Sequence, residues 1–362
     1  MKKFIVAIAA VAMLTGSAYA ADWNFYGSAR VSTFYNDTEE INTPNTDTTN
    51  YAQALQSNAR IGAKVKVSDE LSGRFEYGAA SGNANIRLLY GEWNFGAGKF
   101  LVGQDYTPLY LPGSGQVYAV DNGLGGWGEV YGSRKAQLKL TFGGFQVAVL
   151  APSTNHTLTE VAAATAIATD KTEATIPQIQ AAYTFKGSNW DVTLAGGYQT
   201  FEVAADANMD AAQDVTSYVL AATANMAVGA FKFGASVHGG ENTGNMISVD
   251  VNGFQDGDNG NNGLARYDAG ANKVTDNETF GYRVYAAYTV NDMFGLELGY
   301  GQNSAEYDRA ASEDDEVTAY YLSAPITLAP GVFVIPELGV VDYEEDGQEE
   351  TTYFGAKWQI NF

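Results

Sequence analysis

Few side chains in this sequence could carry enzyme chemistry. It has no cysteine and only two histidines, His156 and His238, and neither histidine has a serine in a recognisable nucleophile motif. Without cysteine the chain has no disulfides and no thiolate chemistry. No glycine-rich phosphate loop is present either, and the glycines have positions typical of strands and turns. We therefore expect a protein that is not an enzyme.

Acidic side chains dominate the charge balance. The chain has 42 Asp and Glu against 20 Lys and Arg, which gives a formal net charge of −22. Nucleic-acid-binding surfaces are basic, so this balance argues against a nucleic-acid partner. Net charge says little about fold, and the elements that position these charges have to be inferred from residue patterning.

Residues 1–20 have the pattern of a secretory signal peptide. Lys2 and Lys3 precede an apolar run from Phe4 to Leu14, and Ala18-Tyr19-Ala20 is a small-residue cleavage pattern. The run is about half of the roughly 20 apolar residues that a membrane-spanning helix needs. We expect cleavage after Ala20, export, and one mature domain over residues 21–362.

The mature chain alternates between apolar and polar residues, as strands with two different faces do. In the first such segment one face carries Trp23, Phe25, Ala29, Val31, Thr33 and Tyr35, and the other carries Asn24, Ser28, Arg30 and Ser32. Residues 55–67 and 280–290 repeat this alternation. One face suits lipid and the other water. Because no later stretch approaches 18 consecutive apolar residues, we expect the membrane segments to be strands and not helices.

Sixteen strand-like segments can be counted along the chain. They start near residues 22, 54, 71, 85, 99, 134, 145, 174, 190, 214, 231, 278, 294, 316, 331 and 351. Short connections near 68–70, 96–98, 143–144, 187–189, 229–230, 291–293 and 329–331 alternate with mostly long ones. An even strand number, short periplasmic turns and long external loops are typical of bacterial outer-membrane barrels. We predict an all-β fold, a transmembrane antiparallel up-and-down β-barrel of 16 strands.

The tryptophans favour the same orientation. Trp23, Trp93, Trp190 and Trp358, four of the five, fall within about four residues of a predicted short turn or a chain terminus. Such clustering is typical of an aromatic girdle at one membrane interface. The core of a soluble sandwich would not place its tryptophans at one end of the strands.

Several motifs resemble the general trimeric porins of Gram-negative outer membranes. They are Ala59-Arg60-Ile61-Gly62-Ala63-Lys64, Leu71-Ser72-Gly73-Arg74-Phe75-Glu76-Tyr77, Arg87-Leu88-Leu89-Tyr90 and Gly98-Lys99-Phe100-Leu101-Val102-Gly103-Gln104-Asp105. Both ends agree, with Asp22-Trp23-Asn24-Phe25-Tyr26-Gly27 in the first strand and a closing Phe362. The motifs are most similar to the homotrimeric porins of sulfate-reducing bacteria. The resemblance implies a homotrimer in the cell outer membrane of a Gram-negative bacterium.

The resemblance also implies a loop that folds into the barrel after the fifth strand. Residues 106–132 occupy that position and contain Asp121 and Glu129. The family's barrel-wall arginines, which face these acids, fall on Arg60 and Arg87 and more loosely on Arg134. Strand alternation adds Arg30 and Arg74 to this wall.

Two departures from the family pattern affect these assignments. The family's Pro-Glu-Phe-Gly-Gly loop motif is absent, and Leu111-Pro112-Gly113-Ser114-Gly115 stands in a similar place. Arg134 shares its strand face with apolar residues, which leaves Lys135 and Lys139 as alternatives for the lumen. If Arg87 points inward, regular alternation also turns Trp93 inward, so a bulge is required between them.

A barrel of 16 strands leaves an aqueous interior. Arginines on one wall opposite acids on a loop would create a transverse field that orients polar solutes. We therefore expect an outer-membrane channel for passive diffusion of ions and small hydrophilic solutes. Two alternatives stay open. One is a channel selective for small anions such as sulfate, bound by the arginine wall, and the other is a surface or structural barrel that transports nothing.

The acidic clusters fall in or beside the predicted external loops. One cluster is Glu313-Asp314-Asp315-Glu316, and Asp342 to Asp346 and Glu349-Glu350 form others. Solvated loop charge is the simplest interpretation. Carboxylates could also bind Ca²⁺ or Mg²⁺ and bridge to anionic lipopolysaccharide. Beyond such ions we expect no cofactor.

The last strand, Thr351 to Phe362, alternates as clearly as the first. Phe354, Ala356, Trp358, Ile360 and Phe362 form the face assigned to lipid. We expect this strand to close the barrel against the first one. The resemblance implies that the terminal Phe362 is read by the machinery that assembles outer-membrane barrels.

Overall fold

The computed structural model describes residues 21–40, 48–79, 82–159, 171–204, 212–251, 262–268, 273–308, 314–343 and 349–362. Its strands are β1 (Asp22–Glu40), β2 (Thr48–Leu55), β3 (Arg60–Lys66), β4 (Leu71–Gly78), β5 (Asn85–Asn94), β6 (Lys99–Tyr106), β7 (Arg134–Phe142), β8 (Phe145–Leu150), β9 (Thr157–Thr159), β10 (Thr172–Glu173), β11 (Gln178–Lys186), β12 (Trp190–Val203), β13 (Gln213–Val228), β14 (Phe231–Glu241), β15 (Arg266–Asp268), β16 (Lys273–Thr275), β17 (Asn277–Thr289), β18 (Gly295–Tyr307), β19 (Asp315–Ser323), β20 (Ile326–Ala329), β21 (Val332–Tyr343) and β22 (Glu349–Asn361). A 3₁₀ turn, η2 (Thr243–Asn245), follows β14. Among the described residues, no helix is long and apolar enough to cross a membrane.

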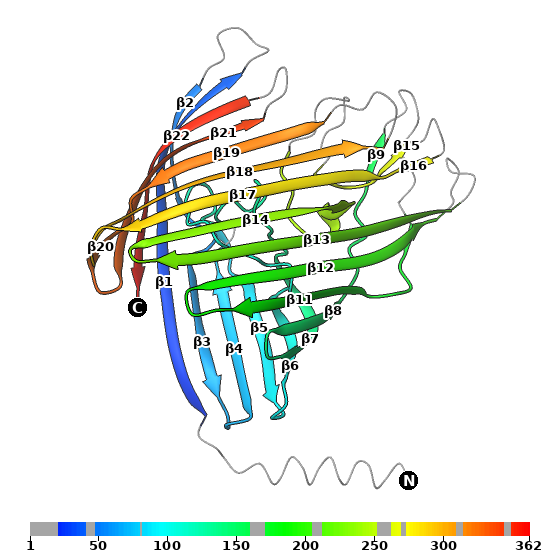
Figure 1. Ribbon diagram of the computed structural model, residues 1–362, viewed down its shortest axis with the longest axis horizontal. Coiled ribbons are helices and arrows are strands. Elements are labelled where there is room, and N and C mark those ends of the chain that lie inside the picture. The colour runs from blue at the N-terminus through cyan, green and yellow to red at the C-terminus, as the bar shows by residue number, and fades with distance from the viewer. Residues whose placement is uncertain are drawn as a thin grey trace.

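Nineteen strand segments form one antiparallel sheet that closes on itself. Three barrel strands are each divided into two segments that pair with the same neighbouring strand: β2 and β3 pair with β1, β10 and β11 with β12, and β19 and β20 with β21. The nineteen segments therefore make up sixteen barrel strands. β22 pairs with β1 from Asn361 opposite Ser28 to Glu349 opposite Glu40 (Figure 1). This pairing closes the barrel and confirms the predicted fold.

Tight turns join the strands at one end of the barrel. The β7–β8 and β13–β14 turns contain only residues 143–144 and 229–230. Gly143 and Gly229 begin them with φ of 56° and 59°. Two-residue hairpins require positive φ, which glycine adopts without steric cost. The connections at the other end are mostly longer.

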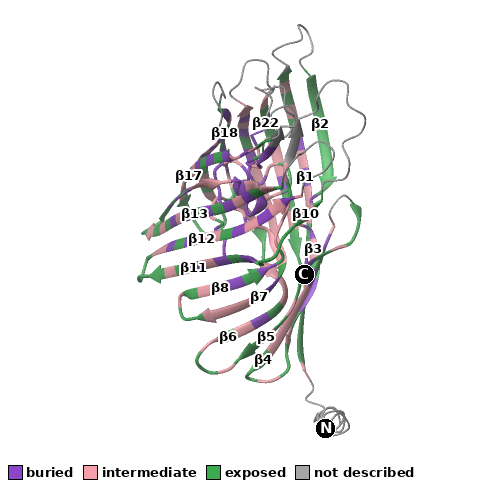
Figure 2. Cartoon of the chain, turned by 90° about the vertical axis from the view of Figure 1, so that its right-hand side faces the viewer, coloured by how far each residue is buried: buried purple, intermediate pink, exposed green. Residues whose placement is uncertain are grey.

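The strands present an apolar face outward and a polar face inward. On β1, Trp23 and Phe25 are 54% and 69% exposed, whereas Ser28 and Ser32 are buried. Along β12 and β13 buried and exposed segments follow one another in the same way (Figure 2). Exposed apolar residues surround the barrel, a surface that suits lipid and would be unusual in water. The four girdle tryptophans are between 46% and 54% exposed on this face.

The structure confirms the bulge that the sequence required between Arg87 and Trp93. The register of β4 and β5 shifts so that Glu76 is opposite Leu88 while Tyr77 is opposite Ile86, which leaves Arg87 without a partner residue. Arg87 is therefore buried inside the barrel and Trp93 faces out. A bulge redirects side chains in this way because it adds one residue to one strand only.

Two features differ from the predicted segments. The second barrel strand begins at Thr48 and not near residue 54, and its first part, β2, is exposed along its whole length. Its sequence, TTNYAQAL, does not alternate between apolar and polar residues, so the alternation pattern could not predict this strand. In addition, β9, β15 and β16 form a separate three-stranded sheet made of loop residues.

Candidate pore constriction

The connection from β6 to β7 folds into the barrel and crosses its interior. We call residues 107–133 the inner loop. Leu109 N donates to Gln180 Oε1 of β11 at 3.2 Å, and Val117 N donates to Glu337 Oε2 of β21 at 2.7 Å. Gln56 Nε2, directly after β2, donates to Val117 O at 2.9 Å. Contacts with such widely separated strands are consistent with the trace inside the barrel in Figure 1.

Two inward carboxylates hold the backbone of the inner loop. Glu337 is 4% exposed and also accepts a hydrogen bond from Tyr118 N, at 2.9 Å. Glu297 of β18 accepts from Gly115 N and from the hydroxyl of Tyr321. Loop N–H groups that no strand satisfies are thus paired with carboxylates, which form strong hydrogen bonds. The sequence analysis did not assign Glu297 or Glu337, although a carboxylate inside a membrane strand is itself a functional signal.

Glycines let the inner loop touch the barrel wall. Gly128 has φ of 91°, and a Cβ there would lie 2.0 Å from Tyr282 O of β17. A Cβ on Gly301 of β18 would lie 2.0 Å from Trp127 O. Only residues without a side chain fit these close approaches.

The first basic group on the lumen wall surrounds Asp121. Arg30 of β1 makes an ion pair with Asp121, and Lys357 Nζ of β22 lies 2.9 Å from the other carboxylate oxygen. Asp121 has φ of 59°, so a left-handed turn presents its side chain to both cations. The resemblance predicted Asp121 opposite the arginines, whereas the structure places it in direct contact with Arg30.

The second basic group surrounds Glu76 of β4, a residue that the sequence analysis did not assign. The Nε of Arg87 lies 2.7 Å from its carboxylate, Nη2 of Arg74 3.0 Å, and Nη1 of Arg60 3.6 Å. The hydroxyl of Tyr26 donates to the same carboxylate at 2.8 Å. The structure brings together three of the five arginines expected on this wall, around an acid of the wall itself.

Tyr106 extends this group towards β7. Its hydroxyl accepts from Arg87 Nη2 at 3.3 Å and from Arg134 Nη1 at 3.4 Å. The Arg134 guanidinium also lies 5.3 Å from the centre of the Tyr106 ring. Lys135 Nζ donates to Asn245 O at 3.2 Å, away from the arginines. Lys139 forms an ion pair with Asp105 at 2.6 Å.

Glu129 lies apart from the basic wall. It is 1% exposed and accepts from Ser114 N at 2.8 Å, and Arg283 Nε of β17 lies 3.2 Å from its carboxylate. The inner loop therefore turns Glu129 towards the opposite wall, where it holds the loop. The geometry differs from the expected one, in which Glu129 faces the arginines across water.

Between the inner loop and the basic wall lies an open space of about 370 Å³. Arg30, Arg60 and Lys357 line it on the wall side, and Tyr110, Ser114 and Glu297 are among the residues across from them. The two basic groups and Arg134 contain six cationic side chains and two carboxylates, Glu76 and Asp121, which leaves a net charge of +4. The wall side of the passage is therefore positive, while the carboxylates of Glu129 and Glu297 also line the open space.

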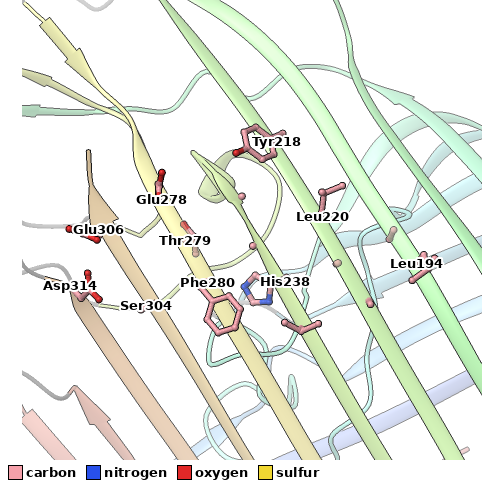
Figure 3. A pocket seen from close by; sticks show the side chains of 16 residues that line it. Leu194, Tyr218, Leu220, His238, Glu278, Thr279, Phe280, Ser304, Glu306 and Asp314 are labelled. Atoms are coloured by element: carbon pink, nitrogen blue, oxygen red, sulfur yellow. The ribbon is translucent and has the colours of Figure 1, made fainter. Parts of the chain in front are cut away.

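A hollow of about 750 Å³ lies on the outer wall across β12 to β18. Exposed Leu220 and Phe280 lie along it, with Glu306 and Asp314 at one end (Figure 3). His238 borders it from β14 but is 2% exposed. The hollow belongs to the apolar outer face and does not join the lumen residues.

The remaining predicted residues lie at the outer loops and the chain end. Glu313 lies outside the described residues, as do residues 1–20, whereas Asp314 is exposed and Asp315 is buried. Among the described residues, no group of three or more His, Asp or Glu side chains could hold a metal ion. Phe362 is 72% exposed and pairs through its backbone with Gly27, at 2.6 and 3.0 Å.

Comparisons with known proteins agree with this architecture. The family model described as Gram-negative porin matches residues 7–346. No curated protein matches the sequence. Among solved structures, the outer membrane channel DcaP of Acinetobacter baumannii matches with a TM-score of 0.69 and 17% identity, over 96% of this chain and 99% of that one.

Two further structures show the same fold. The anion-selective porin from Comamonas acidovorans matches with a TM-score of 0.60 and 12% identity, over 94% of this chain and 100% of that one. The trimer form of OmpT from Vibrio cholerae matches with a TM-score of 0.56 and 18% identity, over 94% and 99%. The family match covers nearly the whole sequence, and the structure is a closed 16-stranded barrel. The chain therefore belongs to the Gram-negative porin family and is an outer-membrane diffusion channel.

Proposed function

We propose that this diffusion channel is a homotrimer that prefers small anions over cations. The observation that carries the preference is the net charge of +4 on the wall beside the open space. Charged side chains at a constriction act on an ion at short range, with little water between them. The preference extends to small anions such as sulfate, as a general attraction without a dedicated binding site.

The acidic outer surface does not oppose this preference. The whole chain has a net charge of −22, and most of its acids lie away from the basic wall. Exposed charges are screened over about 8 Å at physiological salt, so loop acids act weakly on an ion inside the pore. Of the wall cations, Arg30, Arg60 and Lys357 line the open space itself and lie closest to an ion that crosses it.

The trimer is supported by the family and by its structural neighbours. OmpT of Vibrio cholerae has been solved in a trimer form. The sequence motifs are similar to the homotrimeric porins of sulfate-reducing bacteria, which supports the same assembly. The Comamonas acidovorans protein is an anion-selective porin of the same fold.

Export and assembly follow the same proposal. Residues 1–20 serve as a cleaved signal peptide, and Phe362 is read by the barrel-assembly machinery. In the membrane the outward apolar face contacts lipid. The acidic outer loops, with Glu313, Asp314 and Asp315, contact lipopolysaccharide through Ca²⁺ or Mg²⁺.

Planar-bilayer recordings of the purified protein test the proposal. We expect large, stable conductance steps that often come in threes. Under a KCl gradient, the zero-current potential should have the same sign as the equilibrium potential of Cl⁻. A protein without conductance would support the alternative of a structural barrel that transports nothing. A zero-current potential with the sign of the K⁺ equilibrium potential would overturn the anion preference.

A further inference from the structure

A second connection also folds into the barrel and lies on the inner loop. We call residues 242–251, which follow β14, the clamp segment. Asn242 turns the chain inward with φ of 50°, and its side chain donates to Thr216 O at 2.7 Å. Asn277 N donates to the side-chain oxygen of Asn242 at 2.9 Å. The start of the clamp segment is therefore fixed to β13 and β17.

Three hydrogen bonds join the clamp segment to the inner loop. Ser248 N donates to Tyr131 O at 3.0 Å, and Asp250 N donates to Gly126 O at 3.0 Å. The indole of Trp127 donates to Asp250 Oδ2 at 3.2 Å. Gly126 has φ of 99°, and a Cβ there would lie 3.3 Å from the Cβ of Asp250. The two loops thus pack backbone against backbone.

Apolar side chains fill the space behind both loops. In the clamp segment Met246, Ile247, Val249 and Val251 are at most 5% exposed. They share one cluster with inner-loop residues such as Leu109, Leu124 and Val130, and with wall residues such as Val219 and Val317. A close-packed apolar region excludes water. Among the described residues, the open space beside the inner loop lies on its other side, along the basic wall.

The clamp segment is also tied to the wall on its far side. Asn245 O accepts from Lys135 Nζ at 3.2 Å. The side chain of Asn245 accepts from Asn155 N and donates to Asn155 O, both at 3.1 Å. These contacts connect the clamp segment to β7 and to the connection after β8, so it is held at both sides of the inner loop.

We propose that residues 242–251 are a size-determining element of the pore. They hold the inner loop against the wall of β11 to β19 and so fix the width of the passage beside the arginines. The inner loop alone is a long connection without regular structure, and such connections open locally unless other contacts hold them. This inference rests on the channel function proposed above.

Two variants and a control test the role of the clamp segment. The first replaces residues 246–251 with alternating Gly and Ser, which removes the apolar anchors. The second is Asp250→Ala, which removes the hydrogen bonds that the Asp250 carboxylate makes with Trp127 and with Tyr343 of β21 and keeps the apolar contacts. The control is Ser248→Ala, because the Ser248 side chain is exposed and its backbone N–H remains. Single-channel conductance, open-channel noise and the size limit for polyethylene glycols are measured for each trimer.

We expect the Gly/Ser variant to conduct more and to admit larger polymers than the wild type. In Asp250→Ala the inner loop should occupy displaced positions on the order of tenfold more often, because hydrogen bonds to a charged group are lost. The open channel should therefore be noisier than in the wild type. Ser248→Ala should match the wild type. If the Gly/Ser variant forms no channels, Asp250→Ala decides. In that case, an Asp250→Ala channel with the noise and the polymer size limit of the wild type would overturn the inference. If the Gly/Ser variant does conduct, a polymer size limit equal to that of the wild type would also overturn it. A silent wild type would instead overturn the channel function.

Discussion

Replacing Glu76 with glutamine removes the acid at the centre of the basic wall and keeps the side-chain volume. The net charge of the wall rises from +4 to +5, because one of the two carboxylates among six cations is neutralised. We expect Glu76→Gln to shift the zero-current potential further towards that of Cl⁻. We also expect it to destabilise the barrel, because Glu76 pairs with three arginines.

The size of that destabilisation follows from the burial of each arginine. Arg87 and Glu76 are 2% and 1% exposed, and breaking a buried pair from one side costs about 3–5 kcal/mol. Arg60 and Arg74 have side chains that are 20% and 28% exposed, so losing their pairs costs about 0–1 kcal/mol each. We therefore expect the free energy of unfolding to fall by about 3–5 kcal/mol, mostly through Arg87.

Urea unfolding of the barrel in lipid vesicles, followed by tryptophan fluorescence, measures this loss. Glu92→Gln is the matched control, since Glu92 pairs with Lys99 at 2.8 Å and both side chains are more exposed. The control should lose less than about 1 kcal/mol. The reasoning is refuted if Glu76→Gln is as stable as Glu92→Gln, or if its zero-current potential moves towards that of K⁺.

Three further predictions concern the inner loop, assembly and processing. Glu337→Ala leaves the buried N–H groups of Val117 and Tyr118 without an acceptor, at about 1–3 kcal/mol each, so single channels should become noisier than in the Glu337→Gln control. A Glu337→Ala channel as quiet as the wild type would contradict this. Deleting Phe362 should reduce the amount of heat-modifiable trimer in the outer membrane more than it changes the conductance of inserted channels, and normal insertion would count against its assembly role. N-terminal sequencing of the mature protein should begin at Ala21, and any other first residue would show that the cleavage site is wrong.

Alternation along the chain was enough to predict the barrel and the orientation of its strands. A period of two is a local property, so β1 could be divided into its lipid and lumen faces without knowing its neighbours. The same regularity revealed the bulge, because Arg87 and Trp93 cannot both have their expected orientations without one. It failed at β2, where the strand extends beyond lipid and its residues no longer alternate in polarity.

The pairing of charges inside the lumen could not be predicted in the same way. Lys357 and Arg30 meet at Asp121 only because the last strand closes against the first, across most of the sequence. Glu76 lies two residues after Arg74 on the same face of β4, although the sequence analysis did not assign it. Its three arginine partners, however, depend on the stagger of β3, β4 and β5.

The clamp segment was not predicted because its apolar and polar residues do not alternate with a regular period. Met246, Ile247, Val249 and Val251 form a short apolar stretch in a long connection, and such a stretch can be a strand, a buried loop or a membrane contact. Its role depends on the surface it packs against. That surface is the inner loop, whose own path depends on glycines that fit against distant carbonyl groups.

The most direct test of the basic wall is the zero-current potential of the double variant Arg60→Ala with Arg87→Ala under a KCl gradient. The change lowers the net charge of the wall from +4 to +2 by removing two of its six cations. The wild type should have a potential set by Cl⁻, and the double variant should shift towards the potential of K⁺. An unchanged potential, or a shift towards the potential of Cl⁻, would contradict the proposal that this wall selects the ions that pass.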